Sequence, residues 1–349
     1  MWALTVVPRV PSSVVLRELP EPTPSEGQLL VQCLAVGVCG TDHDIVEGRY
    51  GLAPEGEGFL ILGHESLGRV LQAPRGSSWN PGDLVVGVVR RPDPAPCPSC
   101  AVGEWDMCSN GDYTERGIKG RHGFAAERFL LESDFAIRVA PTLAALGVLL
   151  EPCSVMAKAW EQIDRIGARG GAFQPRTVLI TGAGPIGLLG ALLSVQRGYE
   201  VHVFDRVESG PKPELVRELG AEYHSGDLKE LGFSPDIVLE CTGAGRVVLD
   251  SLVSTAPNGI VCLVGLSSST QRLSLNPAEL NNSMVLDNAV VFGCVNANLR
   301  HYRAAEEALM AAPPAWLARL ISRRVPLADW PRVFEHPPDD IKSVLQFSE

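Results

Sequence analysis

Short runs of hydrophobic residues dominate the first part of the chain. Runs rich in Val and Leu, such as WALTVV at Trp2 and QLLVQCLAVGVC at Gln28, are separated by clusters of Pro, Gly and Ser such as PEPTPSEG. Aliphatic runs between turn-forming clusters predict β-strands joined by loops. We therefore expect a β-rich, partly closed barrel over roughly the first 150 residues.

A different pattern follows, in which strand-like and helix-like segments alternate. TVLIT, EVHVFD, DIVLECT and GIVCLVGL are strand-like, whereas PIGLLGALLSVQR and ELVRELG between them are helix-like. Such alternation predicts βαβ units around a parallel sheet. It ends near residue 295, before the helical stretch HYRAAEEALMAA. We expect an α/β fold of two domains, with residues 1–152 and 297–349 in the β-rich domain and residues 153–296 in a doubly wound sheet domain.

Composition and charge exclude several classes of protein. The 349 residues carry a formal net charge of −11, which argues against non-specific binding to nucleic acid or to an anionic membrane. No apolar run approaches the ~20 residues of a membrane span, and the first residues show no signal-peptide pattern. Nine cysteines, an odd number, suit reduced thiols better than a disulfide framework, so we expect a cytoplasmic protein.

A glycine-rich turn lies between a predicted strand and a predicted helix. Gly182, Gly184 and Gly187 form G-x-G-x-x-G in TVLITGAGPIGLLGALL. The first glycine permits a tight turn, the second lets the backbone approach a pyrophosphate, and the third lets helix and strand pack closely. Asp205 follows the next strand, near the position of a ribose-binding carboxylate. These features predict a dinucleotide site in a Rossmann domain; a glycine-rich loop without a ligand is the alternative.

The β-rich part contains candidate metal ligands in three separate segments. They are Cys39 in GVCGTDHDI, His64 and Glu65 in ILGHESLG, and Glu151 in LLEPCSV. Singly, Cys39 suits a core thiol and His64 a hydrogen-bonded turn residue. Together, and upstream of a dinucleotide fold, they predict a catalytic zinc site with one open position. Glu151 has three possible roles: it binds zinc directly, it binds through water, or it contacts the substrate.

The order of these domains resembles the zinc-dependent medium-chain dehydrogenases, the alcohol dehydrogenase superfamily, over nearly the whole chain. CGTD at Cys39, GHE at Gly63 and GAGPIG at Gly182 are specific at superfamily level. YTERGIKGRHGFAAERF at Tyr113, LLEP, and GCVNANLRHY at Gly293 are similar to its glucose 1-dehydrogenase branch. The resemblance implies a GroES-like β-rich catalytic domain followed by a Rossmann domain.

A lobe at residues 93–108 gains a role from the same resemblance. Such dehydrogenases often hold a structural zinc with C-x2-C-x2-C-x7-C, and the last three positions match Cys97, Cys100 and Cys108. The first position falls on Pro94, which cannot bind metal, whereas Asp93 one residue earlier offers a carboxylate. Two alternatives stay open. Glu104, Asp106 or water completes the site, or the lobe holds no metal.

The activity that the resemblance implies is oxidation of an aldose, foremost D-glucose, at C1 to the lactone, with hydride transfer to NAD or NADP. Zinc would lower the pKa of the bound hydroxyl. Thr41 and Glu65 are the expected catalytic residues, with Thr41 as the proton-relay hydroxyl. The outer relay is open, because the relay histidine of some relatives falls on Asp44, next to His43. The implied substrate-binding residues are Thr41, Glu115, Glu151 and Asn298, and Asn298 suits a turn residue equally well.

The implied coenzyme-binding residues are Gly182, Ala183, Gly184, Pro185, Ile186, Gly187, Asp205, Arg206, Leu266, Ser267, Cys294 and Asn296. Asp205 favours NAD, because a carboxylate accepts hydrogen bonds from the ribose hydroxyls and repels a 2′-phosphate. Arg206 favours NADP, because a guanidinium pairs with that phosphate. We expect NAD to be at least competitive with NADP.

Other functions of the same superfamily remain as alternatives. A polyol dehydrogenase of the sorbitol type and an L-threonine dehydrogenase share the zinc motifs, and a non-enzymatic member would retain the fold for binding or regulation. The intact set of Cys39, His64 and Glu151 favours an enzyme. We expect a homo-oligomer, dimer or tetramer, that binds a small sugar. His122, His224 and His336 show no partner pattern, and we expect surface or structural roles for them.

Overall fold

The computed structural model describes residues 1–267 and 271–347. Contacts divide the chain into two compact units: Met1–Ser154 with Asn296–Glu349 form the first, and Val155–Val295 form the second. Helix α3 (Leu150–Gly167) runs across the boundary between them. The chain therefore leaves the first unit, builds the second, and returns to complete the first.

The first unit is built mainly from strands, as the hydrophobic runs predict. Its sheets have the orders β2-β1-β4, β11-β6-β5-β3-β19-β18 with β10 added on β3, and β7-β8-β9. The strands are β1 (Trp2–Val6), β2 (Val15–Glu18), β3 (Gln28–Val38), β4 (Leu60–Ile61), β5 (Glu65–Gln72), β6 (Leu84–Gly87), β7 (Arg90–Arg91), β8 (Thr114–Arg116), β9 (Gly120–Arg121), β10 (Arg128–Glu132), β11 (Ala136–Arg138), β18 (Arg323–Pro326) and β19 (Ser343–Gln346). Helices α1 (Gly40–Val46), α2 (Pro98–Ala101), α8 (Leu299–Ala311) and α9 (Pro314–Leu320) also lie in this unit.

Strand β3 is the centre of the first unit. Its side chains alternate between buried and half-buried positions, and Leu29, Val31 and Cys33 join the core. Strand β5 pairs with it on one side and β19, from the end of the chain, on the other. Residues far apart in the sequence therefore meet at the carboxyl end of β3.

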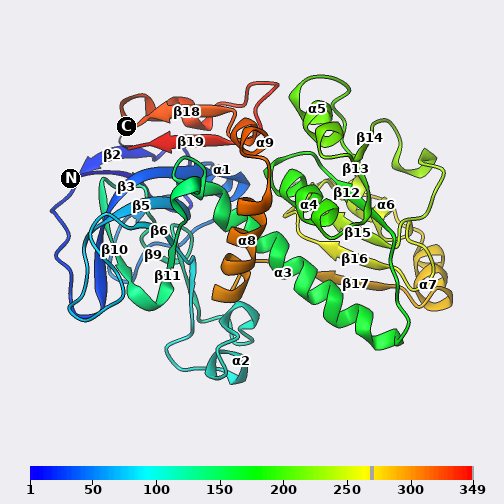
Figure 1. The fold of residues 1–349 in the computed structure, drawn as a ribbon, viewed down its shortest axis with the longest axis horizontal. Coiled ribbons are helices and arrows are strands. Elements are labelled where there is room, and N and C mark those ends of the chain that lie inside the picture. The colour runs from blue at the N-terminus through cyan, green and yellow to red at the C-terminus, as the bar shows by residue number, and fades with distance from the viewer. Residues whose placement is uncertain (268–270, 348–349) are drawn as a thin grey trace. The chain divides into compact units, whose positions relative to one another are not determined.

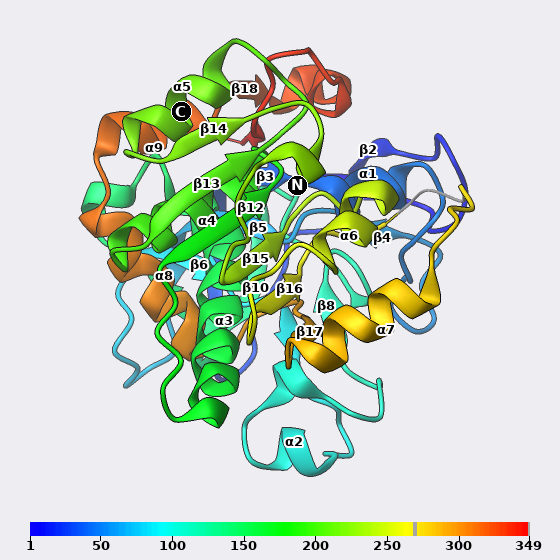
Figure 2. The same cartoon turned by 90° about the vertical axis from the view of Figure 1, so that its right-hand side faces the viewer.

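The second unit is a parallel sheet of six strands in the order β14-β13-β12-β15-β16-β17. Its elements are β12 (Thr177–Thr181), α4 (Pro185–Gln196), β13 (Glu200–Phe204), α5 (Pro211–Glu218), β14 (Glu222–His224), β15 (Ile237–Glu240), α6 (Gly245–Ser251), β16 (Ile260–Leu263), α7 (Pro277–Leu286) and β17 (Val290–Gly293). Figure 2 shows α7 beside β17 at one edge, and β14 forms the other edge. The strand order reverses at β12, and ligands of such sheets bind at the carboxyl ends of the strands at this point. The predicted α/β class with a doubly wound sheet is confirmed.

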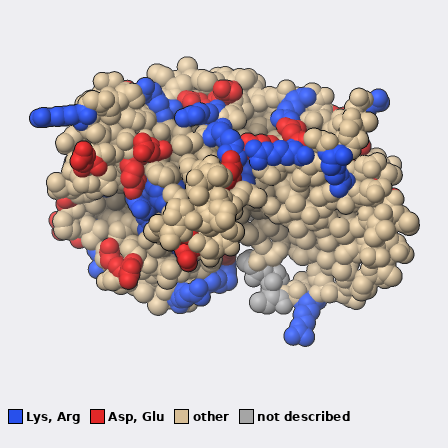
Figure 3. Space-filling model, turned by 90° about the horizontal axis from the view of Figure 1, so that it is seen from below, with Lys and Arg blue, Asp and Glu red and all other residues tan. Residues whose placement is uncertain are grey.

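The lobe that carries α2 lies between β7 and β8 and projects from the sheets of the first unit (Figures 1 and 2). On the face drawn in Figure 3, basic and acidic side chains are interspersed among the described residues. This face does not offer the broad basic surface that nucleic acid binding requires. None of the helices in the described part of the chain combines the length and apolar character that a bilayer crossing requires.

One carboxylate ties the small β7-β8-β9 sheet to β10. Glu132 Oε2 accepts hydrogen bonds from Arg91 Nη2 at 2.7 Å and from Arg116 Nη2 at 3.2 Å, and Oε1 accepts one from Arg121. Burial opposes ionisation of Glu132, but the arginines outweigh it and hold the pKa of this carboxyl well below its usual range. Glu132 is therefore ionised at neutral pH and links all three strands of the sheet to β10.

We predict that Glu132→Gln lowers the thermal unfolding midpoint at pH 7 by several degrees. Removing one partner of such an ion pair costs roughly 3 kcal/mol, because three arginines lose their counter-charge. A depressed folded-state pKa contributes stability above the unfolded-state value of about 4.3 and loses it as the pH falls below that value. The midpoint gap to wild type should therefore narrow below about pH 4. Glu18→Gln on the exposed face of β2 is the control, and a gap that stays constant down to acidic pH would contradict this role.

Candidate functional site

The first cluster of candidate metal ligands forms where β3 ends and α1 begins. Cys39 is the N-cap of α1, and its Sγ accepts the backbone N–H of Thr41 at 3.3 Å. His64, buried just before β5, places Nε2 at 3.1 Å from Cys39 Sγ. Pairing of β3 with β5 thus brings together two ligand types that lie 25 residues apart.

Asp42 orients the imidazole of His64. Its Oδ1 lies 3.5 Å from His64 Nδ1, and its Oδ2 accepts the backbone N–H of Cys39 at 3.0 Å. Burial opposes protonation of His64, but Cys39 and Asp42 outweigh it and raise the pKa of His64 well above its ordinary value. A carboxylate beside Nδ1 favours the tautomer with the proton on Nδ1, which leaves Nε2 available to a metal ion. The surroundings of Nε2 therefore favour a cation.

Glu65 forms a buried ion pair with Lys342, which comes just before β19. Gly37 lies between the two strands, and a Cβ there would be 2.0 Å from Glu65 Oε2 and 3.0 Å from Lys342 Cε. The absence of a side chain at position 37 lets the two charges meet. Burial disfavours the charged lysine, but Glu65 outweighs it and raises the pKa of Lys342. The buried lysine therefore compensates the charge of Glu65 within the cluster of candidate ligands.

Glu151 and Thr41 belong to the same region. Glu151 opens α3 and is buried, and burial raises the pKa of its carboxyl to about 7, with the charge of Glu65 raising it further and His64 opposing. Thr41 is half-buried on the first turn of α1. The donor atoms of Cys39, His64 and Glu65 lie within 4.8 Å of one another. The carboxyl of Glu151 lies near enough to this group for the charges of His64 and Glu65 to shift its pKa.

The distances in this cluster fit a zinc ion. Bond lengths of about 2.3 Å to sulfur and 2.0–2.1 Å to nitrogen place the two donors about 3.6 Å apart around a tetrahedral ion. The separation of 3.1 Å between Cys39 Sγ and His64 Nε2 must therefore grow by about 0.5 Å. A soft thiolate, an imidazole and carboxylates form a suitable donor set for zinc.

A second polar cluster surrounds Glu115, in β8. Its Oε1 accepts hydrogen bonds from Arg90 Nε at 3.1 Å, from Arg90 Nη2 at 2.9 Å and from Asn296 Nδ2 at 2.9 Å. The Arg90 guanidinium also lies over the Tyr113 ring, 3.7 Å from its centroid. These bonds all end on Oε1, so Oε2 can accept further hydrogen bonds. Asn296, expected at the coenzyme, lies in the first unit and orients Glu115.

Asn298, for which a substrate contact and a turn role are both expected, is a helix cap in the structure. It caps α8 by accepting the backbone N–H of Leu299 at 2.7 Å. Its Nδ2 donates to Gly103 O at 2.7 Å and to Asp106 Oδ1 at 2.9 Å. Asn298 therefore tethers the lobe to the start of α8.

The lobe gathers its three cysteines. The sulfur atoms of Cys97, Cys100 and Cys108 lie within 4.8 Å of one another, and those of Cys97 and Cys108 are 3.9 Å apart. Two sulfurs bound to one zinc lie about 3.8 Å apart, so this spacing fits the ion. Hydrogen bonds from Ser109 and from the Cys100 backbone lower the pKa of Cys97 to about 5, whereas burial raises the pKa of Cys100 to about 11. Cys97 is therefore a thiolate at neutral pH.

The carboxylates of the lobe already have partners. Asp93 is buried, its Oδ1 accepts the Ala95 N–H at 2.8 Å, and its Oδ2 accepts a hydrogen bond from Asn110. Asn110 Oδ1 in turn lies 3.0 Å from Cys108 Sγ. Glu104 pairs with Arg300 at 2.7 Å, and Asp106 accepts from Asn298. Asp93 is thus linked to the thiols through Asn110 rather than grouped with them.

The glycine-rich turn of the second unit has the geometry that each glycine predicts. Gly182 has φ of +93°, which favours glycine. A Cβ on Gly187 would lie 1.8 Å from Gly182 O, so only glycine lets the helix approach the strand. A Cβ on Gly184 would meet nothing within 4 Å, which leaves open space at the N-cap of α4. Pro185 has no N–H, so the free backbone donors at this helix start belong to Ile186 and Gly187.

The remaining candidates for coenzyme binding lie at strand ends of the same unit. Asp205 Oδ2 accepts the Ala183 N–H at 2.6 Å, which holds the carboxylate beside the turn. Arg206 is exposed. Ser267 donates to Gly243 O at 2.7 Å, Leu266 is exposed, and Cys294 is buried after β17.

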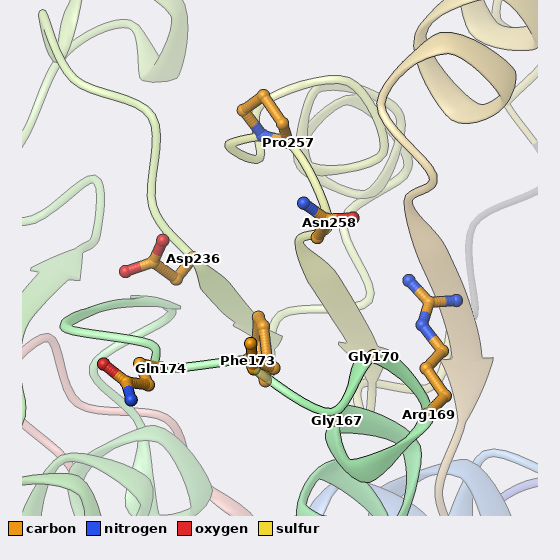
Figure 4. A pocket seen from close by; sticks show the side chains of 9 residues that line it. Gly167, Arg169, Gly170, Phe173, Gln174, Asp236, Pro257 and Asn258 are labelled. Carbon is orange, nitrogen blue, oxygen red and sulfur yellow. The ribbon is translucent and has the colours of Figure 1, made fainter.

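Figure 4 shows a separate cavity of about 300 Å³ in the second unit, lined by residues that include Phe173, Arg169 and Asn258. It lies before β15 and β16, at the amino ends of the parallel strands. Ligands of such sheets bind at the carboxyl ends. Asp236 on its wall accepts the backbone N–H groups of Arg176 and Thr177. The cavity is therefore distinct from the glycine-rich turn.

Three residues of these clusters escaped sequence reasoning. Asp42 carried a usable signal, because it stands three residues after Cys39 at N3 of a helix, where a carboxylate completes a capping box. Lys342 lies 277 residues from Glu65 and has no local pattern. Arg90 follows a hydrophobic run and reads locally as a strand end, so its burial against Glu115 depends on tertiary structure alone.

Comparisons with known proteins agree with this organisation. Residues 25–141 match the alcohol dehydrogenase GroES-like domain, and residues 144–347 match the glucose dehydrogenase C-terminus. Glucose 1-dehydrogenase of Thermoproteus tenax is 41% identical over 352 residues, and glucose 1-dehydrogenase 2 of Vulcanisaeta moutnovskia is 39% identical over 351 residues. Each alignment covers 99% of this chain and 99% of the relative.

A solved structure of Haloferax mediterranei glucose dehydrogenase in complex with NADP, Zn and gluconolactone is also similar. It covers 100% of both chains, with a TM-score of 0.92 and 32% sequence identity. The resemblance drawn from the CGTD, GHE and GAGPIG motifs is confirmed. The chain belongs to the zinc-dependent medium-chain dehydrogenases, in the glucose dehydrogenase branch.

Proposed function

We propose that this protein is a zinc-dependent glucose 1-dehydrogenase that oxidises D-glucose at C1 to the lactone with hydride transfer to NAD or NADP. The single observation that carries the proposal is the set of half-buried Cys39 and buried His64 and Asp42, whose side chains meet with the geometry of a zinc site, in a chain of this family. The NADP, Zn and gluconolactone of the Haloferax mediterranei complex correspond to the coenzyme, the metal and the product of this reaction.

Cys39 and His64 are the proposed zinc ligands, with a carboxylate from Glu65 or Glu151. When bound, zinc supplies Lewis-acid polarisation of the sugar hydroxyl. Asp42 keeps the His64 ring in one orientation. The Thr41 hydroxyl, two residues after the first ligand, would accept the proton that leaves the sugar and pass its own hydroxyl proton on toward solvent. Lys342 neutralises Glu65 and so reduces the buried negative charge of the site.

Glu115 is the proposed sugar-recognition residue. Arg90 and Asn296 fix its Oε1. The fixed carboxylate then presents Oε2 to neighbouring hydroxyls of the sugar, where a charge-assisted hydrogen bond is worth ~1.5–3 kcal/mol. Asn298 acts on the lobe instead, since its side chain is committed to α8 and to Asp106.

In the second unit, Gly182, Ala183, Gly184, Pro185, Ile186 and Gly187 are proposed to hold the pyrophosphate. Asp205 would accept hydrogen bonds from the ribose hydroxyls and Arg206 would face a 2′-phosphate, with Leu266, Ser267 and Cys294 nearer the nicotinamide end.

The lobe cysteines are proposed to hold a second, structural zinc. Nine free thiols suit a reducing compartment such as the cytoplasm, and a homo-oligomer remains our expectation.

A polyol or L-threonine dehydrogenase is the alternative, because the zinc ligands are the same. We predict that the wild type oxidises D-glucose more efficiently than sorbitol or L-threonine. Glu115→Ala should lower kcat/KM for glucose roughly ten- to a hundred-fold, because one charge-assisted bond is lost. It should also reduce discrimination among glucose, galactose and xylose. Reduced-nicotinamide absorbance measures both.

Glu104→Gln is the matched control for this experiment, because Glu104 also pairs with an arginine but lies in the lobe. It should leave kcat/KM unchanged. Better turnover of sorbitol or L-threonine than of every aldose by the wild type would replace glucose with the alternative.

Asp205→Asn should shift the coenzyme preference toward NADP by about tenfold. The change removes the charge that repels a 2′-phosphate but keeps an acceptor for the Ala183 N–H. The ratio of kcat/KM for NADP to that for NAD measures the shift, with Asp227→Asn, a cap of another turn in this unit, as control. A wild type strictly specific for NADP would show that Arg206 dominates.

Zinc analysis tests the lobe. The wild type should hold about two zinc ions per chain, one for each ligand set, and Cys97→Ser should hold about one. Asp93→Ala should weaken lobe zinc and lower thermal stability more than specific activity, whereas Asp112→Ala, at an exposed position just after the lobe, should do neither. One zinc in the wild type, together with three freely reactive lobe thiols, would show that the lobe binds no metal.

A further inference from the structure

Two histidines and two glutamates meet at the edge of the parallel sheet in the second unit, in a cluster that the proposed reaction does not use. His202 Nδ1 lies 2.9 Å from His224 Nε2. The carboxylate of Glu222 lies 3.7 Å from His202 Nδ1 and 3.8 Å from His224 Nε2. One donor atom from each of these three residues fits within a span of 4.8 Å. Sequence reasoning expected only a surface or structural role for His224.

The sheet itself creates this arrangement. Strand β14 is the edge strand and pairs in parallel with β13, so His202 stands opposite Glu222 and Phe204 opposite His224. His202 and His224 thus lie on a diagonal of the same face, within reach of each other. Phe233 packs on the His202 ring, with centroids 4.2 Å apart, and shields one side of the cluster from water.

The charges around the imidazoles lack a cation. Glu200 and Glu222 are mostly exposed, and the only titratable partners within 4.0 Å of their carboxylates among the described residues are the two histidines. A hydrogen bond between two ring nitrogens requires one of them to be unprotonated, as a metal-binding nitrogen must be. Neutral imidazoles and carboxylates are the forms that bind metal.

We propose that His202, His224 and Glu222 form a binding site for a divalent transition metal such as zinc, which clamps edge strand β14 to β13. Nitrogens bound to one zinc at 2.0–2.1 Å lie about 3.3 Å apart in a tetrahedral site. The observed 2.9 Å therefore needs an opening of about 0.4 Å, and the exposed Glu222 side chain can close in by a similar amount. Two imidazoles exclude Mg²⁺ and Ca²⁺, which take oxygen ligands.

Glu200 completes the site from behind. Its Oε1 lies 3.4 Å from Nε2 of His202, the nitrogen that faces away from His224. A carboxylate there accepts the ring N–H and directs the Nδ1 lone pair toward the metal. The proposed metal site is also connected to the glycine-rich turn through Asp205. The backbone N–H of Asp205 donates to His224 O at 3.1 Å, and its carboxylate accepts the Ala183 N–H.

Calorimetric titration of zinc chloride into the purified enzyme, with its tightly held zinc retained, tests the proposal. The wild type should take up one further zinc ion, and zinc should raise its thermal unfolding midpoint. His224→Gln should lower this affinity about ten- to a hundred-fold and abolish the rise. His336→Gln, the same change on a histidine of the first unit, should behave as wild type.

Glu222→Gln is a second test in case His224→Gln does not fold. The Glu222 side chain is exposed, so this variant should fold, and it too should weaken zinc binding. Equal zinc uptake and affinity in wild type, His224→Gln and Glu222→Gln would overturn the proposal, as would a wild type that binds no zinc beyond the catalytic and lobe ions. In either case the two imidazoles form only a hydrogen bond to each other. Glucose oxidation is not the readout, so failure here leaves the proposed reaction untouched.

Discussion

A glycine in the central strand lets two opposite charges meet inside the first unit, and the candidate zinc site depends on this contact. Gly37 lies on β3 between Glu65 of β5 and Lys342, which comes just before β19. A side chain at position 37 would collide with Glu65. The pair fixes three strands in one register. That register sets where β3 ends, and therefore where Cys39 lies relative to His64.

The electrostatics of the buried cluster explain why a cation belongs there. Two buried carboxylates and a buried imidazole lie close to the half-buried thiol of Cys39. Lys342 balances Glu65, but Cys39 and Asp42 still act together on His64 and favour its protonated form. The remaining negative charge can be balanced either by a proton on His64 Nε2 or by a zinc ion. Zinc additionally leaves a coordination position for a substrate hydroxyl.

The sequence was most informative where function depends on local geometry. The roles of Gly182, Gly184 and Gly187 follow from the backbone alone, and the structure gives each the φ or close approach expected. Alternating hydrophobic segments likewise predicted the parallel sheet. Tertiary partners were less accessible, since Lys342 and Arg90 acquire their roles only when distant strands pair. Asn296 and Asn298 illustrate this limit, because one side chain orients Glu115 and the other caps a helix.

Zinc content measured together with glucose oxidation in His64→Ala tests the central claim most directly. The substitution removes the imidazole beside Asp42, while Gly37 and the Glu65–Lys342 ion pair that it permits remain. The protein should stay folded, lose about one zinc ion per chain, and lose glucose oxidation. A folded His64→Ala protein that keeps its zinc and oxidises glucose at the wild-type rate would contradict a catalytic metal site at Cys39 and His64.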